Sequence, residues 1–406
     1  MPQFIPLQFY QYNWSDNRID PEKVISPPYD VMSEQDKTNL AETEYNVVHL
    51  DSPVSYEAAA GKLDAWFADE ILVQDSSPGF YIMATDYQAG NDKKTRWGIF
   101  GGLRLHPFED KKVFPHEQTY SKAKTDRLNL MQATHGQLSP IFGVYNDPGL
   151  ILEEIGRKCL ENRPLISFTQ ENGVFNRMWR VPAEYHQTVE NLIQDKKVFI
   201  ADGHHRYETA LNYQNMKPRH EKAPWNHVFM YLSNIASPGL EIFPYHRIIS
   251  HKADFDWDEI LNRAEQDFEI SVSQKFPDIH AEPRSDSFIL YCSKGFVSMK
   301  PRNMPEDIFY HIGAYVLDRL FLRQAMKLSE RELASVEFLS YSHDQSTVIS
   351  RVDQGTAQAG FILKPVPMDV LGQVCETGQV MPRKSTFFYP KLPTGALFHL
   401  WRDKFD

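Results

Sequence analysis

The sequence predicts an α+β protein built from mixed sheets with flanking helices. Two neighbouring strand-like segments, 79–87 and 96–105, are separated by the turn-forming residues AGNDKK, which indicates a hairpin. Segments with apolar residues at helical spacing, such as 55–70, lie between the predicted strands. Hairpins and helices therefore mix without the regular strand–helix–strand repeat that one doubly wound sheet requires.

The composition excludes several classes of protein. Of 406 residues, 42% are hydrophobic and 24% charged, as in ordinary globular proteins, and the net charge of −11 argues against a general nucleic-acid binder. No apolar run approaches the ~20 residues that cross a bilayer, and the N-terminus lacks the pattern of a signal peptide. Three widely separated cysteines, Cys159, Cys292 and Cys375, suit a reducing compartment. We therefore expect a cytoplasmic protein that acts on a small molecule and binds neither nucleic acid nor membranes.

The first half of the chain is expected to begin with a turn and short elements. Ser26–Asp30 contains two prolines, which favour a rigid extended turn. Ser33 and Asp36 have the spacing of a capping box for a short helix. The further elements expected here are a strand at 45–50, the helix at 55–70, the hairpin above, helices at 125–133, 148–160 and 183–193, a strand at 141–145, and a second hairpin at 165–169 and 175–181.

The second half is expected to continue the same mixture. Its predicted elements are strands at 227–232, 241–249, 338–341 and 360–363, a hairpin around Lys294–Gly295, and helices at 256–267, 308–326, 343–353 and 368–376. The expected division is into an α+β domain at 1–250 and a smaller α+β domain at 251–406, with a break near Ser250. The C-terminal tail of the second domain is expected to return to the functional site.

Residues 197–211, KVFIADGHHRYETAL, contain the strongest candidate for a site. An apolar strand ends at Asp202, Gly203 forms a turn, and His204 begins a helix. A helix N-terminus presents unpaired N–H groups and partial positive charge, so such a turn suits an anion. Arg206 can bind a phosphate or carboxylate, and Asp202 can cap the helix or hold a metal. The alternative interpretation is a capped turn with polar residues at the surface.

Three further polar stretches are candidates. His116 and Glu117, in the loop 114–119 before the predicted helix with Asp126, could provide a general base or a magnesium ligand, or else belong to a solvated loop. His246–Arg247 follows an apolar strand. The C-terminal stretch is rich in cations and hydroxyl groups that suit phosphate oxygens, although it also fits a charged surface loop; its residues are Arg383, Lys384, Ser385, Thr386, Tyr389 and Lys391.

These motifs together resemble a known family. The segments SPPYDVMS, YNVVHL, FPHEQT, KTDRL, IADGHHRYETAL, FPYHRII, LSYSHD and MPRKSTFFYPK occur in this order along nearly the whole chain. On these motifs the chain is identified as a member of the family catalogued as domain of unknown function 1015. The family's name records no activity.

The central turn also resembles the nucleotide-binding motif of ParB-type nucleotidases, sulfiredoxins and free-serine kinases. The resemblance implies a ParB/sulfiredoxin-like nucleotide-binding core in which Gly203, His205 and Arg206 contact phosphate, with Asp202 and His204 alongside. The chain departs from sulfiredoxins, which place a cysteine directly after the glycine. It also lacks the basic helix-turn-helix module of the partition proteins.

We therefore expect a phosphotransferase that uses a nucleotide, ATP or ADP, and a small hydroxylated or phosphorylated, serine-like metabolite. In this scheme Lys384, Ser385 and Lys391 help to bind the phosphates, and Asp202 or Glu117 holds Mg²⁺. Catalytic candidates are His116, Glu117, Asp126 and His204. Glu117 is the first candidate for the general base, followed by Asp30 and Asp126. The alternatives are a phosphohydrolase and a non-catalytic sensor of nucleotides or phosphometabolites.

Overall fold

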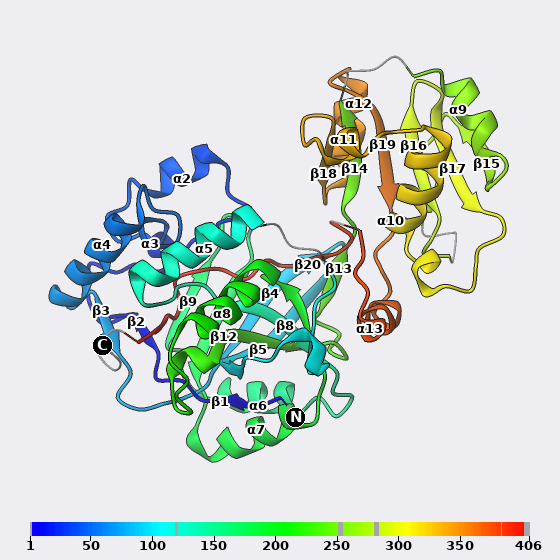
Figure 1. Cartoon of the computed structure of the whole chain (residues 1–406). Helices are drawn as coiled ribbons and strands as arrows, with labels where there is room; N and C mark the ends of the chain where they lie inside the picture. Colours follow the sequence, from blue (N-terminus) through cyan, green and yellow to red (C-terminus); the bar gives the residue numbers. More distant parts are fainter. Residues whose placement is uncertain (1, 118–120, 251–254, 280–283, 383, 402–406) are drawn as a thin grey trace. The chain divides into compact units, whose positions relative to one another are not determined.

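The computed structural model describes residues 2–117, 121–250, 255–279, 284–382 and 384–401 (Figure 1). The chain forms two compact units. The first unit comprises Met1–Pro115, Thr119–Glu241 and Pro390–Asp406, and the second comprises His116–Gln118 and Ile242–Tyr389. The units thus divide after Glu241, and the C-terminal segment belongs to the first unit. The domain boundary predicted near Ser250 includes residues 251 and 252, which lie outside the described residues.

A mixed sheet forms the centre of the first unit. Its strands, in spatial order, are β6 (Val113–Phe114), β11 (Val198–Asp202), β8 (Ile141–Tyr145), β12 (His227–Asn234), β5 (Asp92–Arg104), β4 (Tyr81–Ala89), β10 (Phe175–Arg180) and β9 (Ile166–Thr169), with β1 (Phe4–Ile5) paired to β5. Both predicted hairpins, β4–β5 and β9–β10, are confirmed. β12 pairs in parallel with β8 and antiparallel with β5, so the sheet is mixed.

Helices cover this sheet and meet one another. α6 (Ile151–Cys159) packs on Trp97 of β5, because Gly156 brings the helix so close that an added Cβ would lie 2.5 Å from the indole. α5 (Ser121–Thr134) contacts both α4 (Tyr56–Ala68) and α8 (His204–Met216). The sequence therefore predicted these helices correctly, and α5 and α8 carry the candidate site.

The second unit contains an antiparallel sheet. Its strands, in spatial order, are β15 (Phe268–Ser273), β17 (Gly295–Pro301), β16 (Phe288–Cys292), β19 (Ala357–Leu363), β14 (His246–Ser250) and β18 (Leu339–Ser342). α12 (Gln345–Asp353) packs on one face through Val348, which lies over Gly360 and Ile362. Phe321 packs with Phe288 and Phe361 on the other face.

Three predicted elements are wrong. Residues 45–50 do not form a strand, because the buried Asn46 accepts a hydrogen bond from the Val48 N–H and the short helix α3 (Val48–Asp51) follows. The strand predicted at 241–249 is divided at Pro244, which lacks a backbone donor, into β13 (Glu241–Phe243) and β14. The helix predicted at 308–326 is interrupted by extended backbone at Ile312, where φ is −108° and ψ is 110°.

The remaining described elements complete the two units. They are α1 (Pro21–Val24), α2 (Glu34–Leu40), β2 (Tyr10–Tyr12), β3 (Leu72–Gln74), η1 (Phe108–Asp110), β7 (Gly136–Gln137), η2 (Ala183–Tyr185), α7 (His186–Gln194), η3 (Pro224–Asn226), α9 (Trp257–Ala264), η5 (Ile308–His311), α10 (Gly313–Val316), the π-helical segment η6 (Leu317–Ala325), α11 (Glu330–Ala334), α13 (Met368–Thr377), β20 (Phe387–Tyr389) and β21 (His399–Leu400).

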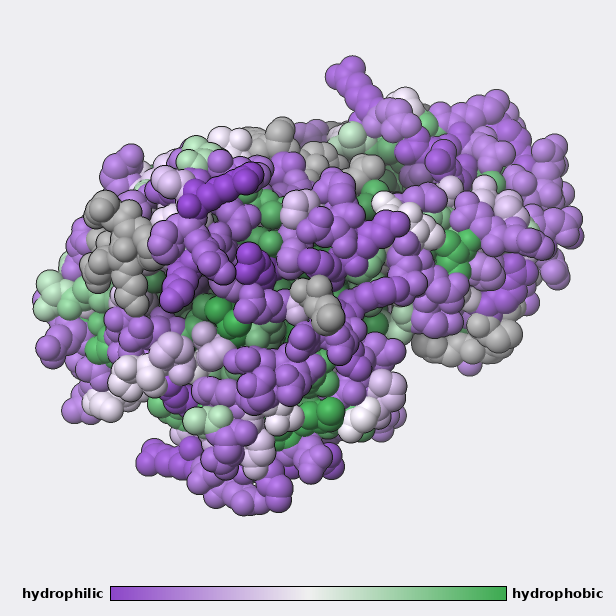
Figure 2. All heavy atoms as spheres, turned by 60° about the horizontal axis from the view of Figure 1, so that its bottom comes forward, coloured by the Kyte–Doolittle hydropathy of each residue, from purple (hydrophilic) through white to green (hydrophobic). Residues whose placement is uncertain are grey.

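One face of the molecule can be judged from its hydropathy. The face seen in Figure 2 is largely hydrophilic, with small hydrophobic areas between the charged side chains. Among the described helices, none combines the length and the apolar character needed to cross a bilayer.

Candidate functional site

The central turn has the predicted order of strand, glycine and helix. β11 ends at Asp202, Gly203 has left-handed backbone with φ 93° and ψ 28°, and α8 begins at His204. No side chain of the described residues caps α8, so the prediction that Asp202 caps this helix is wrong. His204 is buried, whereas His205 is half-buried. The turn thus has the backbone geometry of an anion site.

Asp202 is held by two cations. Its Oδ1 accepts a hydrogen bond of 3.1 Å from Lys391, and its Oδ2 accepts one of 3.2 Å from Arg206. Burial alone would raise the pKa of Asp202, but the charges of Lys391 and Arg206 lower it well below its ordinary value. Lys391 lies in the C-terminal segment that belongs to the first unit. Both carboxylate oxygens therefore serve a structural ion-pair network.

Arg206 folds back over the turn. A Cβ built on Gly203 would lie 3.0 Å from its Nε and Nη2 atoms. Nη1 donates to the Pro140 carbonyl, while Nε is buried and has no hydrogen-bond partner among the described residues. The space beside this glycine is therefore occupied by the Arg206 side chain. The unused Nε donor remains available to an acceptor.

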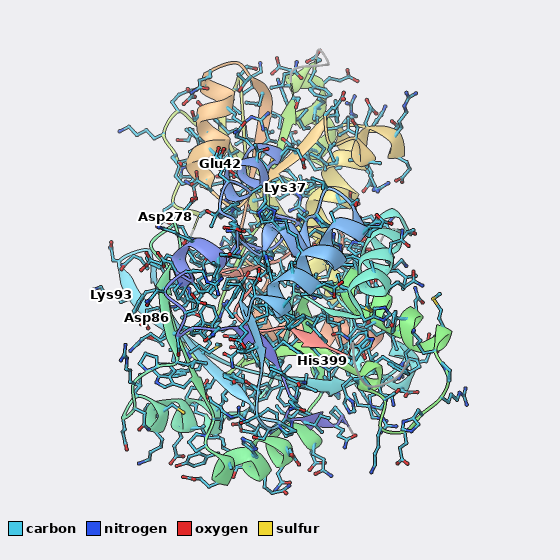
Figure 3. All side chains as sticks on the ribbon, turned by 90° about the vertical axis from the view of Figure 1, so that its left-hand side faces the viewer. Lys37, Glu42, Asp86, Lys93, Asp278 and His399 are labelled. Atoms are coloured by element: carbon cyan, nitrogen blue, oxygen red, sulfur yellow. The ribbon has the colours of Figure 1, made fainter. Side chains whose placement is uncertain are left out.

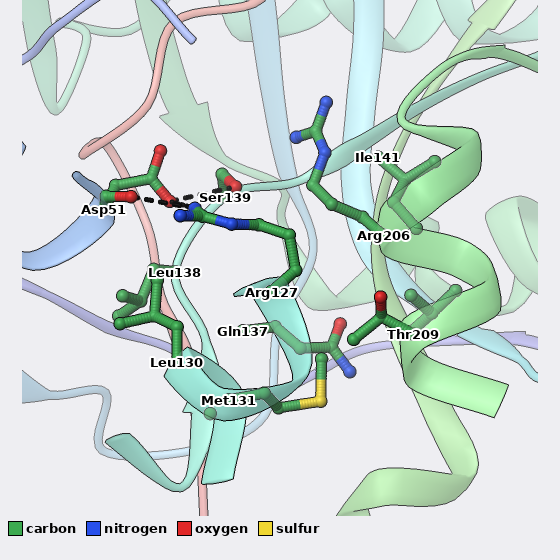
Figure 4. A pocket seen from close by; sticks show the side chains of 12 residues that line it. Asp51, Arg127, Leu130, Met131, Gln137, Leu138, Ser139, Ile141, Arg206 and Thr209 are labelled. Atoms are coloured by element: carbon green, nitrogen blue, oxygen red, sulfur yellow. Dashed lines mark hydrogen bonds and ion pairs between the residues drawn. The ribbon is translucent and has the colours of Figure 1, made fainter. Parts of the chain in front are cut away.

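A small pocket of about 40 Å³ opens beside Arg206 (Figure 4). Its polar lining comes from Asp51, Arg127, Ser139 and Arg206, together with Gln137 and Thr209. Arg127 donates through Nη1 to the Asp51 carbonyl at 2.8 Å and to Oδ1 at 3.3 Å, and Ser139 lies 3.5 Å from the same Oδ1. The other carboxylate oxygen of Asp51, Oδ2, is buried, and in the described part of the chain it has no hydrogen-bond partner. The pocket therefore contains an unused acceptor as well as two guanidinium groups.

The proline-rich turn places Tyr29 against Arg127, one of the residues that line this pocket. The guanidinium of Arg127 stacks over the Tyr29 ring at 4.1 Å from its centroid. Burial raises the pKa of Tyr29 to about 12, and the charges of Arg206, Asp30 and Arg127 all act on the same phenol. Asp30 itself is exposed, and no hydrogen bond or ion pair within the described residues engages its carboxylate. Asp30 is thus an exposed carboxylate whose charge acts on the same phenol as the charges of the two arginines.

Asp51 is the member of this site that sequence reasoning missed. It directly follows the motif YNVVHL, which was assigned to a strand and given no site residue. Burial raises the pKa of Asp51, and the charges of Arg127 and Arg206 partly oppose that effect. Its position at the end of the family motif was the only signal in the sequence.

The carboxylate of Asp126 holds the side chain of its neighbour Arg127. It accepts hydrogen bonds of 2.9 Å from the Tyr56 hydroxyl and from Nε of Arg127. Glu208, on α8, pairs at 2.6 Å with Lys124 on α5. These contacts join the two helices that supply Arg127 and Arg206. They give Asp126 a role in orienting Arg127, and the catalytic role predicted for Asp126 stays a prediction.

The other predicted site residues belong to the second unit. His116 is 1% exposed, and its Nε2 lies 2.9 Å from the Thr386 hydroxyl. Glu117 forms a β-bridge with Met381, and its carboxylate lies 3.9 Å from the His116 ring. Ser385 is buried and donates to the Pro382 carbonyl. The structure thus gathers His116, Glu117 and Ser385 around the segment 381–386.

Lys384 belongs to the same segment. Its ammonium lies 3.5 Å from the Tyr245 hydroxyl and 4.9 Å from the centroid of that ring. Arg383 lies outside the described residues. The predicted site residues therefore fall into two groups, one in each unit, with Asp202, Gly203, His204, His205, Arg206, Asp126 and Lys391 in the first.

A metal site is not evident in either group. Within the part of the chain that the structure describes, no three His, Cys, Asp or Glu side chains gather in a way that could hold a metal ion. Asp202, one of the two predicted ligands, is already neutralised by Lys391 and Arg206. Glu117, the other, belongs to the second unit.

Comparison with known protein families identifies the family of this chain. A family model described as "Protein of unknown function (DUF1015)" matches residues 4–323. The chain belongs to this family. The resemblance inferred from the ordered motifs is thereby confirmed, and the matched range of this DUF1015 protein contains Asp30, Asp51, Arg127 and Arg206. No curated protein matches the sequence significantly.

Several solved structures share a distant likeness with this DUF1015 protein. A free serine kinase in complex with AMP is 15% identical, with a TM-score of 0.37 over 68% of this chain and 83% of that one. SbnI with a C-terminal truncation, from Staphylococcus aureus, is 11% identical, with a TM-score of 0.38 over 71% and 84% of the two chains. A conserved hypothetical protein from Pyrococcus furiosus is 15% identical, with a TM-score of 0.36 over 70% and 90%. Similarity of fold at this level does not identify a ligand.

Proposed function

We propose that the first unit transfers a phosphoryl group between a nucleotide, ATP or ADP, and the hydroxyl group of a small, serine-like metabolite. The observation that carries this proposal is the pair of guanidinium groups, Arg127 and Arg206, that line one small pocket beside the Gly203 turn. The exposed carboxylate of Asp30 acts on the same Tyr29 phenol as both arginines. Phosphoryl transfer requires cations that stabilise the phosphoryl oxygens and a carboxylate that receives the hydroxyl proton. These three residues supply both requirements.

The phosphate would be bound by the turn and the two arginines. The uncapped N-terminus of α8 carries partial positive charge, and Arg206 has an unused Nε donor. Arg127 enters from α5 and is held in place by Asp126 and Asp51. Such fixed donors stabilise charge without reorganising during the reaction. A bound nucleotide would supply the phosphoryl group.

Asp30 is the general base in this proposal. It would take the proton from the substrate hydroxyl while that oxygen forms its bond to phosphorus and the bond from phosphorus to the leaving phosphate oxygen breaks. Asp126 is less suited, because its carboxylate already binds Tyr56 and Arg127. Asp30 thus takes the place that the sequence first assigned to Glu117. The small pocket, with the free Oδ2 of Asp51, suits the polar end of the metabolite.

Magnesium does not fit the residues of the turn. A metal ligand needs free carboxylate oxygens, but both oxygens of Asp202 bind cations. No step of the proposed reaction is therefore assigned to a metal held by Asp202.

A transfer assay tests the proposal. ATP labelled in its γ-phosphate would be incubated with a panel of hydroxylated amino acids and sugars, and labelled products would be separated. We expect transfer to at least one acceptor, and Asp30→Asn should lower the rate by about 10²–10⁴-fold, the usual contribution of a general base. Glu42→Gln provides the matched control, because Glu42 is an exposed carboxylate of the same unit (Figure 3).

Other outcomes would contradict transfer. Release of inorganic phosphate from phosphorylated metabolites without nucleotide would indicate a phosphohydrolase. Stabilisation by nucleotides with no turnover on any acceptor would indicate a sensor. Full activity of Asp30→Asn would remove Asp30 from the reaction.

A further inference from the structure

A second pocket lies within the second unit. Its volume is about 340 Å³, within the size range of sites for small molecules. The floor is one face of β15, β16 and β17, and the residues 277–279 that follow β15 form a wall. It shares no residue with the pocket beside Arg206.

Strand register brings two lysines to this pocket on either side of a serine. Phe288 pairs with Met299 on β17 and with Leu363 on β19. Both pairings are antiparallel, so Ser287 lies next to Lys300 on one side and Lys364 on the other. All three line the pocket. Since neighbouring strands lie about 4.8 Å apart, the two lysine backbones are separated by about 10 Å across the serine.

The hydroxyl group of Ser287 is not what one expects on a sheet face that simply contacts water. Its side chain is 5% exposed, and within the described residues its hydroxyl has no hydrogen-bond partner. A buried hydroxyl without a partner is unfavourable, because it has lost water and gained nothing in return. A ligand in the pocket would provide the missing partner.

The packing of α12 explains why this part of the sheet is open. α12 contacts β14, β16, β18 and β19, and Val348 packs with Ile289 and Ile362. The pocket begins beside this contact, at Ile289, and extends over Ser298 and Ser271, which pair across β17 and β15. The pocket thus combines an apolar edge with a polar floor.

We propose that this pocket binds the phosphoryl group of a small molecule. Lys300 and Lys364 would bind the phosphate oxygens from both sides, and the Ser287 hydroxyl would donate to the same group. The less polar part of the ligand would pack against Ile289 and Ile279. Among the described lining residues, Asp278 in the wall (labelled in Figure 3) is the one that is acidic, and its charge opposes an anion. This site is independent of the phosphoryl transfer proposed for the first unit.

Lysine footprinting of the full chain tests the site. The protein would be treated with an acetylating reagent with and without inorganic pyrophosphate, and each lysine would be quantified by mass spectrometry. We expect pyrophosphate to protect Lys300 and Lys364, whereas Lys275, an exposed lysine of the same unit, should react equally in both samples. Because the readout is resolved by residue, binding beside Arg206 cannot be mistaken for binding here. Malonate in a parallel sample distinguishes a phosphoryl from a carboxylate site.

Variants sharpen the test. Lys300→Gln and Lys364→Gln should each weaken the protection of the other lysine about tenfold, the equivalent of one charge-assisted contact. Asp278→Asn should strengthen the protection, because it removes a like charge. Ser287→Ala should weaken it without lowering the melting temperature, since the hydroxyl has no structural partner. Absence of protection, equal protection of Lys275, or stronger protection by malonate than by pyrophosphate would overturn the proposal.

Discussion

The guanidinium of Arg206 lies directly against the backbone of Gly203. The absence of a side chain at Gly203 creates the space for Nε and Nη2, which would lie 3.0 Å from a Cβ at that position. The turn therefore does more than allow a positive φ. It fixes the position of the arginine that lines the pocket, so the glycine and the arginine act as one unit.

Gly203→Ala should be more destabilising than an ordinary substitution of a left-handed glycine. The φ of 93° costs about 1–2 kcal/mol for a residue with a Cβ, and the contact with Arg206 adds overpacking of about 1–3 kcal/mol. Gly173→Ala is the control, since Gly173 has φ 79° but open space around its Cβ position. Urea unfolding measures both variants. Equal losses of unfolding free energy in the two variants would show that Arg206 can move away from the added methyl group without cost.

Lys391→Met should destabilise the first unit by about 1–3 kcal/mol, because it leaves the partly buried Asp202 with one cation instead of two. The pKa of Asp202 is lowered in the folded state, so its contribution to stability is present above the unfolded value of 3.8 and lost as pH falls below it. The difference in unfolding free energy between the wild type and Lys391→Met should therefore become smaller in acid. Lys158→Met, which breaks an exposed pair with Glu161, should change stability by less than about 1 kcal/mol. A pH-independent difference would assign the effect of Lys391 to packing.

Acid should destabilise the first unit through two buried histidines. Burial lowers the pKa of His227 and of His399 to about 4, from an unfolded value of 6.5. The unfolded chain therefore binds more protons below pH 6.5, and stability should fall between pH 6.5 and 4 by up to about 1.4 kcal/mol per pH unit for each histidine. His399→Gln should flatten this dependence, whereas His220→Gln, at an exposed position of the same unit, should not. Unfolding free energies measured across this range provide the check, and identical slopes in all three proteins would contradict the assignment.

The stacking of Arg127 on Tyr29 should be measurable as a coupling. A double-mutant cycle with Tyr29→Leu and Arg127→Gln is expected to give about 0.5–2 kcal/mol, the range of a partly desolvated cation–π contact. Tyr29→Phe retains the aromatic ring. A second cycle that uses the Tyr29→Phe variant as its starting protein should therefore keep most of the coupling energy. If the Phe cycle loses it, the hydroxyl of Tyr29 rather than its ring accounts for the interaction.

Prediction from sequence succeeded where short-range spacing decides the structure. The strand, glycine and helix of residues 198–216 and the hairpins of the sheet follow from periodicity and turn chemistry within a few residues. It failed at Asn46, because the hydrogen bonds that turn this segment into a helix come partly from distant Ser26 and Lys23. A local pattern of β-branched residues could not reveal those partners.

The sequence by itself determined the family, the mixture of helices and strands, and the type of turn at Gly203. The tertiary structure decided how Asp202 is neutralised, since Lys391 lies 189 positions further along the chain. It also decided that Asp51, Arg127 and Arg206 share one pocket. Backbone propensities act between near neighbours, whereas the meeting of distant charges depends on how whole elements pack, and only that packing brings together these groups.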